Sequence, residues 1–355
     1  MKLYNSKPDA AVRPHTGDPE QRVAEIWAAI EKSDCGKVEK RVLKMLGQKY
    51  VLRLPAFNES LFLKNIDGFR FVYDKEAEAL GLYYFRNNIL KVKSLSKENI
   101  GTLTHEGLHF ASADRTNIVE NNIDEYGHIA VRNGLSFDML DPFIDDDPEF
   151  SKYNGINEGM TAYQDLKVNR YGDCYSFLMH CAYILNDMIT DGDLERVYFN
   201  GGILRPAEKS GDSKTFFKIL RDLDDFHAGE MVAKTKDIVD VSAACVVDIQ
   251  GLVFDLFERR AEEHLSAGTA EVAVRHLSEI EDLFFTKENI KHKNIREYSW
   301  ENGIKGKEVP KDQKTIKGRV AKKIDRKELD AFSHRIAVLK TRLHRQTEGL
   351  APRLV

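Results

Sequence analysis

Five consecutive residues, His105-Glu106-Gly107-Leu108-His109, constrain this chain more than any other segment. On an α-helix, positions four residues apart lie on the same face, one turn from each other. Two imidazoles at that spacing can bind one metal ion, and the carboxylate of Glu106 would lie beside it. The motif therefore predicts a helix that carries a metal site on one face.

The residues around the motif favour a helix over residues 100–113, a stretch without proline. Ser96 is a suitable N-cap, and the helix dipole favours the negative charge of Glu98 in the first turn. Gly107 costs about 1 kcal/mol relative to alanine inside a helix, so we expect it to permit close packing of another element. The predicted apolar face, opposite the histidines, consists of Ile100, Leu103, Gly107, Phe110 and Ala111.

Short runs rich in β-forming residues precede the motif. Leu82-Tyr83-Tyr84-Phe85 and Ile89-Leu90-Lys91-Val92, separated by the polar Arg86-Asn87-Asn88, are typical of a hairpin. We expect further strands at residues 50–54 and 69–73. An edge strand of this small sheet would be able to hold an extended peptide by main-chain hydrogen bonds.

A third metal ligand is expected downstream, because catalytic zinc usually has three protein ligands and one position for water. The best choice is Glu158, in Gly155-Ile156-Asn157-Glu158-Gly159-Met160-Thr161, a segment that we expect to begin a helix ending near Tyr171. This Asn-Glu pair after an HExxH motif resembles the gluzincins, the thermolysin-like clan of zinc peptidases whose third ligand is a glutamate.

A closer likeness is to small bacterial gluzincins, over about residues 80–205. The shared segments include Thr104 to Ser112, Gly134-Leu135-Ser136-Phe137 and Leu194 to Gly202. The resemblance implies an α+β zincin-like catalytic lobe with a small mixed or antiparallel sheet and an active-site helix. It also implies peptidase activity, Zn²⁺ as cofactor, and His105, His109 and Glu158 as its ligands.

One departure from the clan concerns the groups around the metal ligands. Thermolysin-like enzymes place an aspartate four residues after the ligand glutamate, where it orients a zinc histidine, and this chain has Ala162 there. Metal-bound histidines nearly always donate their second N–H to an oxygen. Another acceptor is therefore required, and the options are Thr161, Asp165, Asp124 or a backbone carbonyl.

A second departure is the long interval between His109 and Glu158. Asn133-Gly134 lies between apolar runs in this interval, which is a strong hairpin signal. We therefore expect an inserted hairpin beside the site, where it could contact substrate.

The expected mechanism follows from these residues. Zinc lowers the pKa of bound water to about 7, and Glu106 takes the proton and later passes it to the leaving amine. A further donor usually stabilises the charge on the carbonyl oxygen, and the resemblance suggests a tyrosine, histidine or arginine. Tyr175 is the first choice, with Tyr153 and His180 as alternatives that the sequence does not separate.

The other motifs in the sequence give weaker indications of function. Cys174 and Cys181 are expected to pack as small apolar groups, because a second metal site beside them would need two more ligands. The acidic stretch at residues 141–147 lacks the spacing of an EF-hand and is expected to be a solvated loop. His227 and His264 are expected at the surface.

Composition narrows the class of protein. With 42% hydrophobic and 31% charged residues, 355 residues describe a globular chain long enough for two lobes. Four cysteines without disulfide-framework spacing indicate a reducing compartment. Residues 1–18 are polar and expected to be disordered; they lack the apolar core of a Sec signal, and no run is long enough to span a membrane. We expect a cytoplasmic protein, or one exported without a cleaved Sec signal, such as an injected bacterial effector.

Two domains are expected, a catalytic one at residues 19–205 and a helical one at residues 206–355. A loop is expected at residues 302–317. The expected helices outside the site are residues 21–33, 37–46, 173–189, 213–223, 231–265 and 328–345, the last with Leu329, Phe332, Ile336, Leu339 and Leu343 on one face.

Charge is distributed unevenly between these domains. Residues 286–355 hold 19 Lys or Arg and 9 Asp or Glu, a net charge of about +10 out of a total of −4, which leaves about −14 elsewhere. Such a basic end would bind nucleic acid, bind an anionic membrane, or dock on the chain's own acidic lobe, which we favour.

Three functions are therefore considered: a zinc peptidase acting on peptides or proteins, a catalytically silent zincin-fold interaction protein, and a nucleic-acid-associated protein. Glu106 argues against the second, since a binding module needs no general base.

Overall fold

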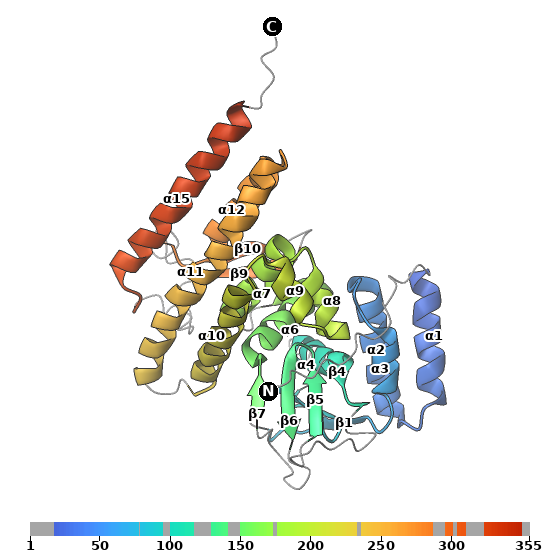
Figure 1. Ribbon diagram of the computed structural model, residues 1–355. Coiled ribbons are helices and arrows are strands. Elements are labelled where there is room, and N and C mark those ends of the chain that lie inside the picture. The colour runs from blue at the N-terminus through green and yellow to red at the C-terminus, as the bar shows by residue number, and fades with distance from the viewer. Residues whose placement is uncertain are drawn as a thin grey trace.

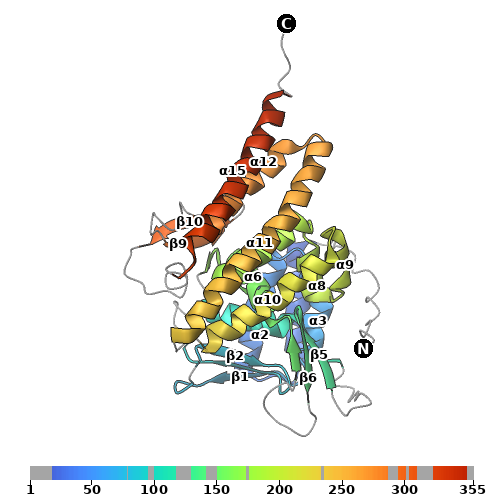
Figure 2. The same ribbon diagram turned by 60° about the vertical axis from the view of Figure 1, so that its left-hand side comes forward.

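The computed structural model describes residues 18–77, 79–94, 100–116, 129–140, 150–172, 176–232, 236–286, 295–300, 304–309 and 323–349. Over these residues the fold is α+β and mostly helical, with a mixed three-stranded sheet, an antiparallel four-stranded sheet and a helical C-terminal part, as the sequence predicts. Figures 1 and 2 show these two sheets at one end of the molecule and the long C-terminal helices at the other.

Three helices open the described chain, α1 (Pro19–Lys32), α2 (Lys37–Arg53) and α3 (Glu59–Lys64). The predicted strand at residues 50–54 is wrong, because α2 continues to Arg53. Leu43, Leu46 and Tyr50 are all buried and lie three or four residues apart. This helical spacing buries one face of the segment, and that burial outweighs the local β preference of its residues.

The first sheet consists of β1 (Arg70–Tyr73), β2 (Gly81–Tyr84) and β3 (Ile89–Val92) in the order β1-β3-β2. Strands β2 and β3 form the predicted antiparallel hairpin, whereas β1 pairs with β3 in parallel. Strand β2 is therefore an edge strand, and its free edge faces the helix that follows.

That helix is α4 (Ile100–Ser112), which carries both motif histidines. Gly107 permits the close approach that the sequence predicts, because a Cβ there would lie 2.5 Å from Tyr50 Oη and 2.8 Å from Leu46 Cδ1. The predicted apolar face needs one correction. Ile100 is 41% exposed, so the buried face begins at Leu103, one turn later.

The second sheet is antiparallel, in the order β4 (Ala113–Asp114), β5 (Ile129–Asn133), β6 (Ser136–Leu140) and β7 (Phe150–Lys152). Strands β5 and β6 confirm the predicted inserted hairpin. Because Asn133 pairs with Ser136, Gly134 occupies the first turn position, with a φ of +62° that glycine adopts without strain.

The helix predicted to begin near residue 155 is α6 (Asn154–Asn169). It is followed by α7 (Ser176–Tyr183), the π-helical turn η2 (Ile184–Ile189), α8 (Asp193–Asn200) and α9 (Leu204–Lys209). The single helix predicted over residues 173–189 is thus divided into α7 and η2, and residues 173–175 lie outside the described ones.

The C-terminal part is built from α10 (Ser213–Val232), α11 (Lys236–Ser266), α12 (Ala270–Leu283) and α15 (Arg326–Gly349). Figure 2 shows α15 lying along α12. The predicted apolar face of α15 is confirmed as buried, and its members are Leu329, Phe332, Ile336, Leu339 and Leu343.

Basic residues of α15 dock on acidic residues of the same chain, as favoured from the charge pattern. Arg335 lies 2.6 Å from Asp255, and Arg342 lies 2.6 Å from Glu262 on the same helix α11. These pairs are partly exposed, and such pairs contribute only about 0–1 kcal/mol each. The apolar face is therefore the larger source of attachment.

A third sheet joins β8 (Tyr171–Gly172), β9 (Ile295–Trp300) and β10 (Ile304–Val309), with β9 in the middle. The predicted loop at residues 302–317 is therefore wrong for β10, while residues 302–303 and 310–317 lie outside the described ones. Strands β9 and β10 pair antiparallel, with Ile304 opposite Trp300.

Most of the buried apolar residues between Ile26 and Leu343 form one core cluster, and Ile129, Val131 and Leu140 form a second, small one. The boundary between residues 205 and 206 stays a prediction. Among the described helices, none combines the length and apolar character needed to cross a membrane.

Candidate metal centre

Helices α4 and α6 bring together the three residues predicted as metal ligands. The Nε2 atoms of His105 and His109 each lie 3.2 Å from a different oxygen of the Glu158 carboxylate. One ligand atom from each residue lies within 4.8 Å of the others, so the group can hold a metal ion. The centroids of the two imidazoles are 5.1 Å apart, as expected for positions i and i+4 of a helix.

The electrostatics of this cluster favour bound positive charge. Burial lowers the pKa of His105, but the hydrogen bond and charge of Glu158 outweigh it and raise the pKa to about 9. Burial raises the pKa of Glu158, yet the two histidines hold it well below the usual range. The carboxylate is thus ionised among buried donors, and a cation between these side chains would satisfy it.

Glu106 lies between this cluster and the edge strand β2. The backbone N–H of Tyr83 donates to its carboxylate. A Cβ on Gly81 would lie 2.8 Å from Glu106 Cγ, so the absence of a side chain there allows β2 to approach α4. Burial raises the pKa of Glu106, and the charges of His105 and His109 partly oppose that rise.

Among the residues that the sequence suggests as acceptors for a histidine N–H, Asp165 is one whose charge acts on the pKa of His105. Its carboxylate accepts hydrogen bonds from Thr104 Oγ1 and from Asn169 Nδ2, the latter at 2.7 Å. Lys49 donates in turn to the Asn169 side chain at 2.9 Å. Burial raises the pKa of Asp165 to about 6, against the opposing charge of His105.

The other acceptors predicted from the sequence differ in placement. The Thr161 hydroxyl donates to the Asn157 carbonyl and contacts Tyr198 Oη, each at 2.8 Å. Its hydrogen bonds are therefore made with these two residues. Asp124 lies outside the described residues.

The segments that carry the gluzincin resemblance pack against one another. The Leu135 N–H donates to Asn157 Oδ1 at 2.9 Å. A Cβ on Gly134 would lie 2.2 Å from the same oxygen and 2.7 Å from Tyr198 Cε2. Matches that are weak when taken singly thus form one interlocked group directly behind Glu158.

The three residues predicted to stabilise the carbonyl oxygen have different outcomes. Tyr175 lies outside the described residues. Tyr153 precedes α6, and its half-buried ring packs on Phe217 with centroids 6.3 Å apart. His180 is fully buried on α7.

His227 on α10, which is expected at the surface, is half-buried and lies near the cluster. Burial lowers its pKa, and the charges of Glu158 and His109 act on it. Helix α10 reaches the site because Asp224, one turn earlier, accepts the N–H groups of Tyr153 and Gly155 at 2.7 and 2.8 Å. No local sequence signal marks this residue, because its role depends on the packing of α10 against α6.

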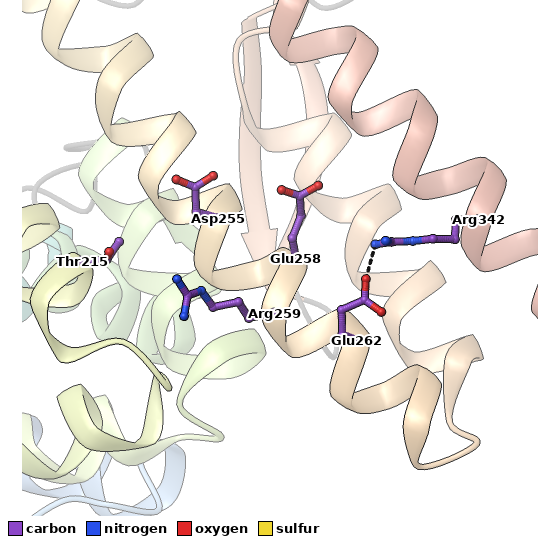
Figure 3. A pocket seen from close by; sticks show the side chains of 6 residues that line it. All are labelled: Thr215, Asp255, Glu258, Arg259, Glu262 and Arg342. Atoms are coloured by element: carbon purple, nitrogen blue, oxygen red, sulfur yellow. Dashed lines mark ion pairs between the residues drawn. The ribbon is translucent and has the colours of Figure 1, made fainter.

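The remaining predicted motifs lie away from the cluster or outside the described residues. Cys181 is fully buried, as predicted, whereas Cys174 and the acidic stretch at residues 141–147 are not described. Figure 3 shows a hollow between α10, α11 and α15 whose charged side chains include the Arg342–Glu262 pair. None of the residues lining it belongs to the metal cluster.

Comparison with known proteins adds no assignment. No protein-family model, no curated protein and no solved structure matches this chain.

Proposed function

We propose that this protein is a single-zinc metallopeptidase of gluzincin type, acting on a peptide or protein substrate. The observation that carries the proposal is the convergence of His105, His109 and Glu158 within 4.8 Å, with Glu106 beside them. Two imidazoles and one carboxylate form the ligand set of catalytic zinc sites that keep one position open.

A bound zinc ion would supply a water of pKa near 7 and polarise the scissile carbonyl. Glu106 is the general base in this proposal: it takes a proton from water and returns it to the leaving amine. Its environment suits both steps, because burial raises its pKa while the neighbouring histidines limit the rise. The Tyr83 N–H holds the carboxylate in place through a hydrogen bond.

Negative charge that develops on the carbonyl oxygen needs a donor. Tyr175 remains the prediction from the sequence, with Tyr153 and His180 as its alternatives. His227 joins them as a further alternative, because it is half-buried on α10 and the charges of Glu158 and His109 act on its pKa.

The edge strand β2 supports a peptide as the substrate class. All four residues of β2 are in register with β3, and the N–H of Tyr83 donates to the Glu106 carboxylate. The carbonyl of Phe85, the residue after β2, accepts a hydrogen bond from Arg115 Nε at 2.7 Å. The edge of β2 that does not pair with β3 therefore lies beside Glu106, and extended peptides pair with such edges.

The two other functions are less well supported. A silent interaction protein leaves the position of Glu106 without a role. Nucleic-acid binding through the basic end is weakened because Arg335, Lys340 and Arg342 pair with acidic residues of the chain itself.

The proposal is tested by two measurements on the full chain. The first is zinc stoichiometry by elemental analysis, where we expect one ion in the wild type and a loss in Glu158→Ala. The second is cleavage of a cell-lysate peptidome, where Glu106→Gln should retain zinc and lose about 100- to 10,000-fold in rate. Glu262→Gln, on the exposed side of α11, serves as the control and should cleave normally. Equal cleavage by the wild type and Glu106→Gln would reject the mechanism, and equal zinc content in Glu158→Ala would reject the ligand set.

A further inference from the structure

The hairpin of β5 and β6 is attached to the end of α4, just after His109. Ala113 in β4 pairs with Asn133 in β5. The Gly134 N–H also donates to the carbonyl of Ser112, the last residue of α4, at 3.2 Å. The position of the hairpin is therefore defined relative to His109.

Strand β6 of this hairpin carries a buried carboxylate, Asp138, which is 3% exposed. The Ser151 hydroxyl on β7 donates to its Oδ1. The Ser136 hydroxyl lies 3.4 Å from Oδ2 and shares its single hydrogen with the Asn133 carbonyl, which is closer at 2.9 Å. No lysine or arginine in the described part of the chain forms an ion pair with it. Burial of a carboxylate is unfavourable without compensation, and two hydroxyl groups compensate only part of it.

His109 has a complementary requirement. Its Nε2 faces Glu158, while its Nδ1 is buried and has no hydrogen-bond partner among the described residues. A histidine that binds metal through Nε2 carries its proton on Nδ1, and that N–H needs an acceptor. Asp138 is close enough for the charge of His109 to lower its pKa, against the larger opposing effect of burial.

We propose that Asp138 is a positioning residue that accepts the Nδ1–H of His109 and so orients the ring toward the metal. This inference rests on the zinc site proposed above. It gives the inserted hairpin a part in the metal centre, where the sequence analysis expects a contact with substrate. With Asp165 on α6 beside His105, each histidine then has its own carboxylate although position 162 is an alanine.

The test compares the zinc affinities of the wild type, Asp138→Asn and Asp187→Asn by competition with a chromophoric chelator. Asparagine keeps the size of the side chain and an oxygen for Ser151, but it removes the charge that favours the imidazole proton. We expect Asp138→Asn to bind zinc about 10- to 100-fold more weakly, the usual effect of losing such a partner. Asp187 is the matched control, because it is also a carboxylate with a pKa raised by burial, held by Tyr163 and Asn186 instead of the histidines. Asp187→Asn should bind zinc as the wild type does.

A measurement on the wild type alone covers the case in which Asp138→Asn fails to fold. In the zinc-loaded protein, ¹⁵N-edited NMR should show a slowly exchanging Nδ1 proton of His109 with nuclear Overhauser contacts to the β-protons of Asp138. Absence of those contacts, or a zinc affinity of Asp138→Asn within twofold of the wild type, would overturn the inference. A wild type that binds no zinc would overturn the proposed function instead, so the two failures are distinguishable.

Discussion

Substitution of Gly134 by alanine tests the interlock behind Glu158. The residue has a φ of +62°, which costs an L-residue about 1–2 kcal/mol. The new Cβ would also lie 2.2 Å from Asn157 Oδ1 and 2.7 Å from Tyr198 Cε2, so the amide of Asn157 must move. That movement breaks the buried hydrogen bond from the Leu135 N–H, which costs about 1–3 kcal/mol when its donor is left unpaired. The expected loss is about 2–5 kcal/mol in the free energy of unfolding.

Gly268→Ala is the matched control, since Gly268 has a φ of +71° but nothing within 4 Å of a built Cβ. It should lose only the backbone contribution of about 1–2 kcal/mol. The assay is urea unfolding followed by circular dichroism, with unchanged m-values as the condition for comparing midpoints. In an Asn157→Ala background the cost of Gly134→Ala should fall, because the two residues are in contact. If Gly134→Ala and Gly268→Ala cost the same within about 0.5 kcal/mol, the close approach described here is refuted.

Three further predictions concern the metal, the pH dependence and the last helix. Free zinc at 100 times its dissociation constant should stabilise the wild type by about 2.7 kcal/mol, seen as a higher melting temperature that EDTA reverses, and Glu158→Gln should show no such increase. Burial lowers the pKa of His276 to about 4, so its contribution to stability is present above pH 6.5 and is lost as the pH falls toward 4. The unfolding free energy of His276→Gln should therefore fall less steeply than that of the wild type between pH 6.5 and 4. An unchanged slope would contradict this. Phe332→Ala should lower the free energy of unfolding by about 3–5 kcal/mol, because the centroid of its ring lies 5.4 Å from that of Phe254 and 6.1 Å from that of Phe284 in the core. A loss below about 1 kcal/mol in urea unfolding would show that α15 is not part of the core.

Local periodicity explains most of what the sequence predicts correctly. The spacing of His105 and His109 defines a shared helix face without reference to any other part of the chain. The same reasoning predicts the buried face of α15, and the Asn133-Gly134 signal predicts the hairpin of β5 and β6. The prediction from local residues is wrong at residues 50–54. Tyr50 is buried against α4, and this packing stabilises a helical conformation although the residues there favour a strand.

The sequence by itself predicted the candidate ligand types, the helical spacing of His105 and His109 and a carboxylate beside them, because these depend on residue identity and on neighbours within a few residues. Only the tertiary structure decided which groups surround the histidines. Asp165, Asp138 and His227 come from α6, β6 and α10, and their distances from α4 are set by helix and strand packing over long separations in the chain. Side-chain contacts of that kind have no periodic signal in the sequence, since they arise from the whole core at once.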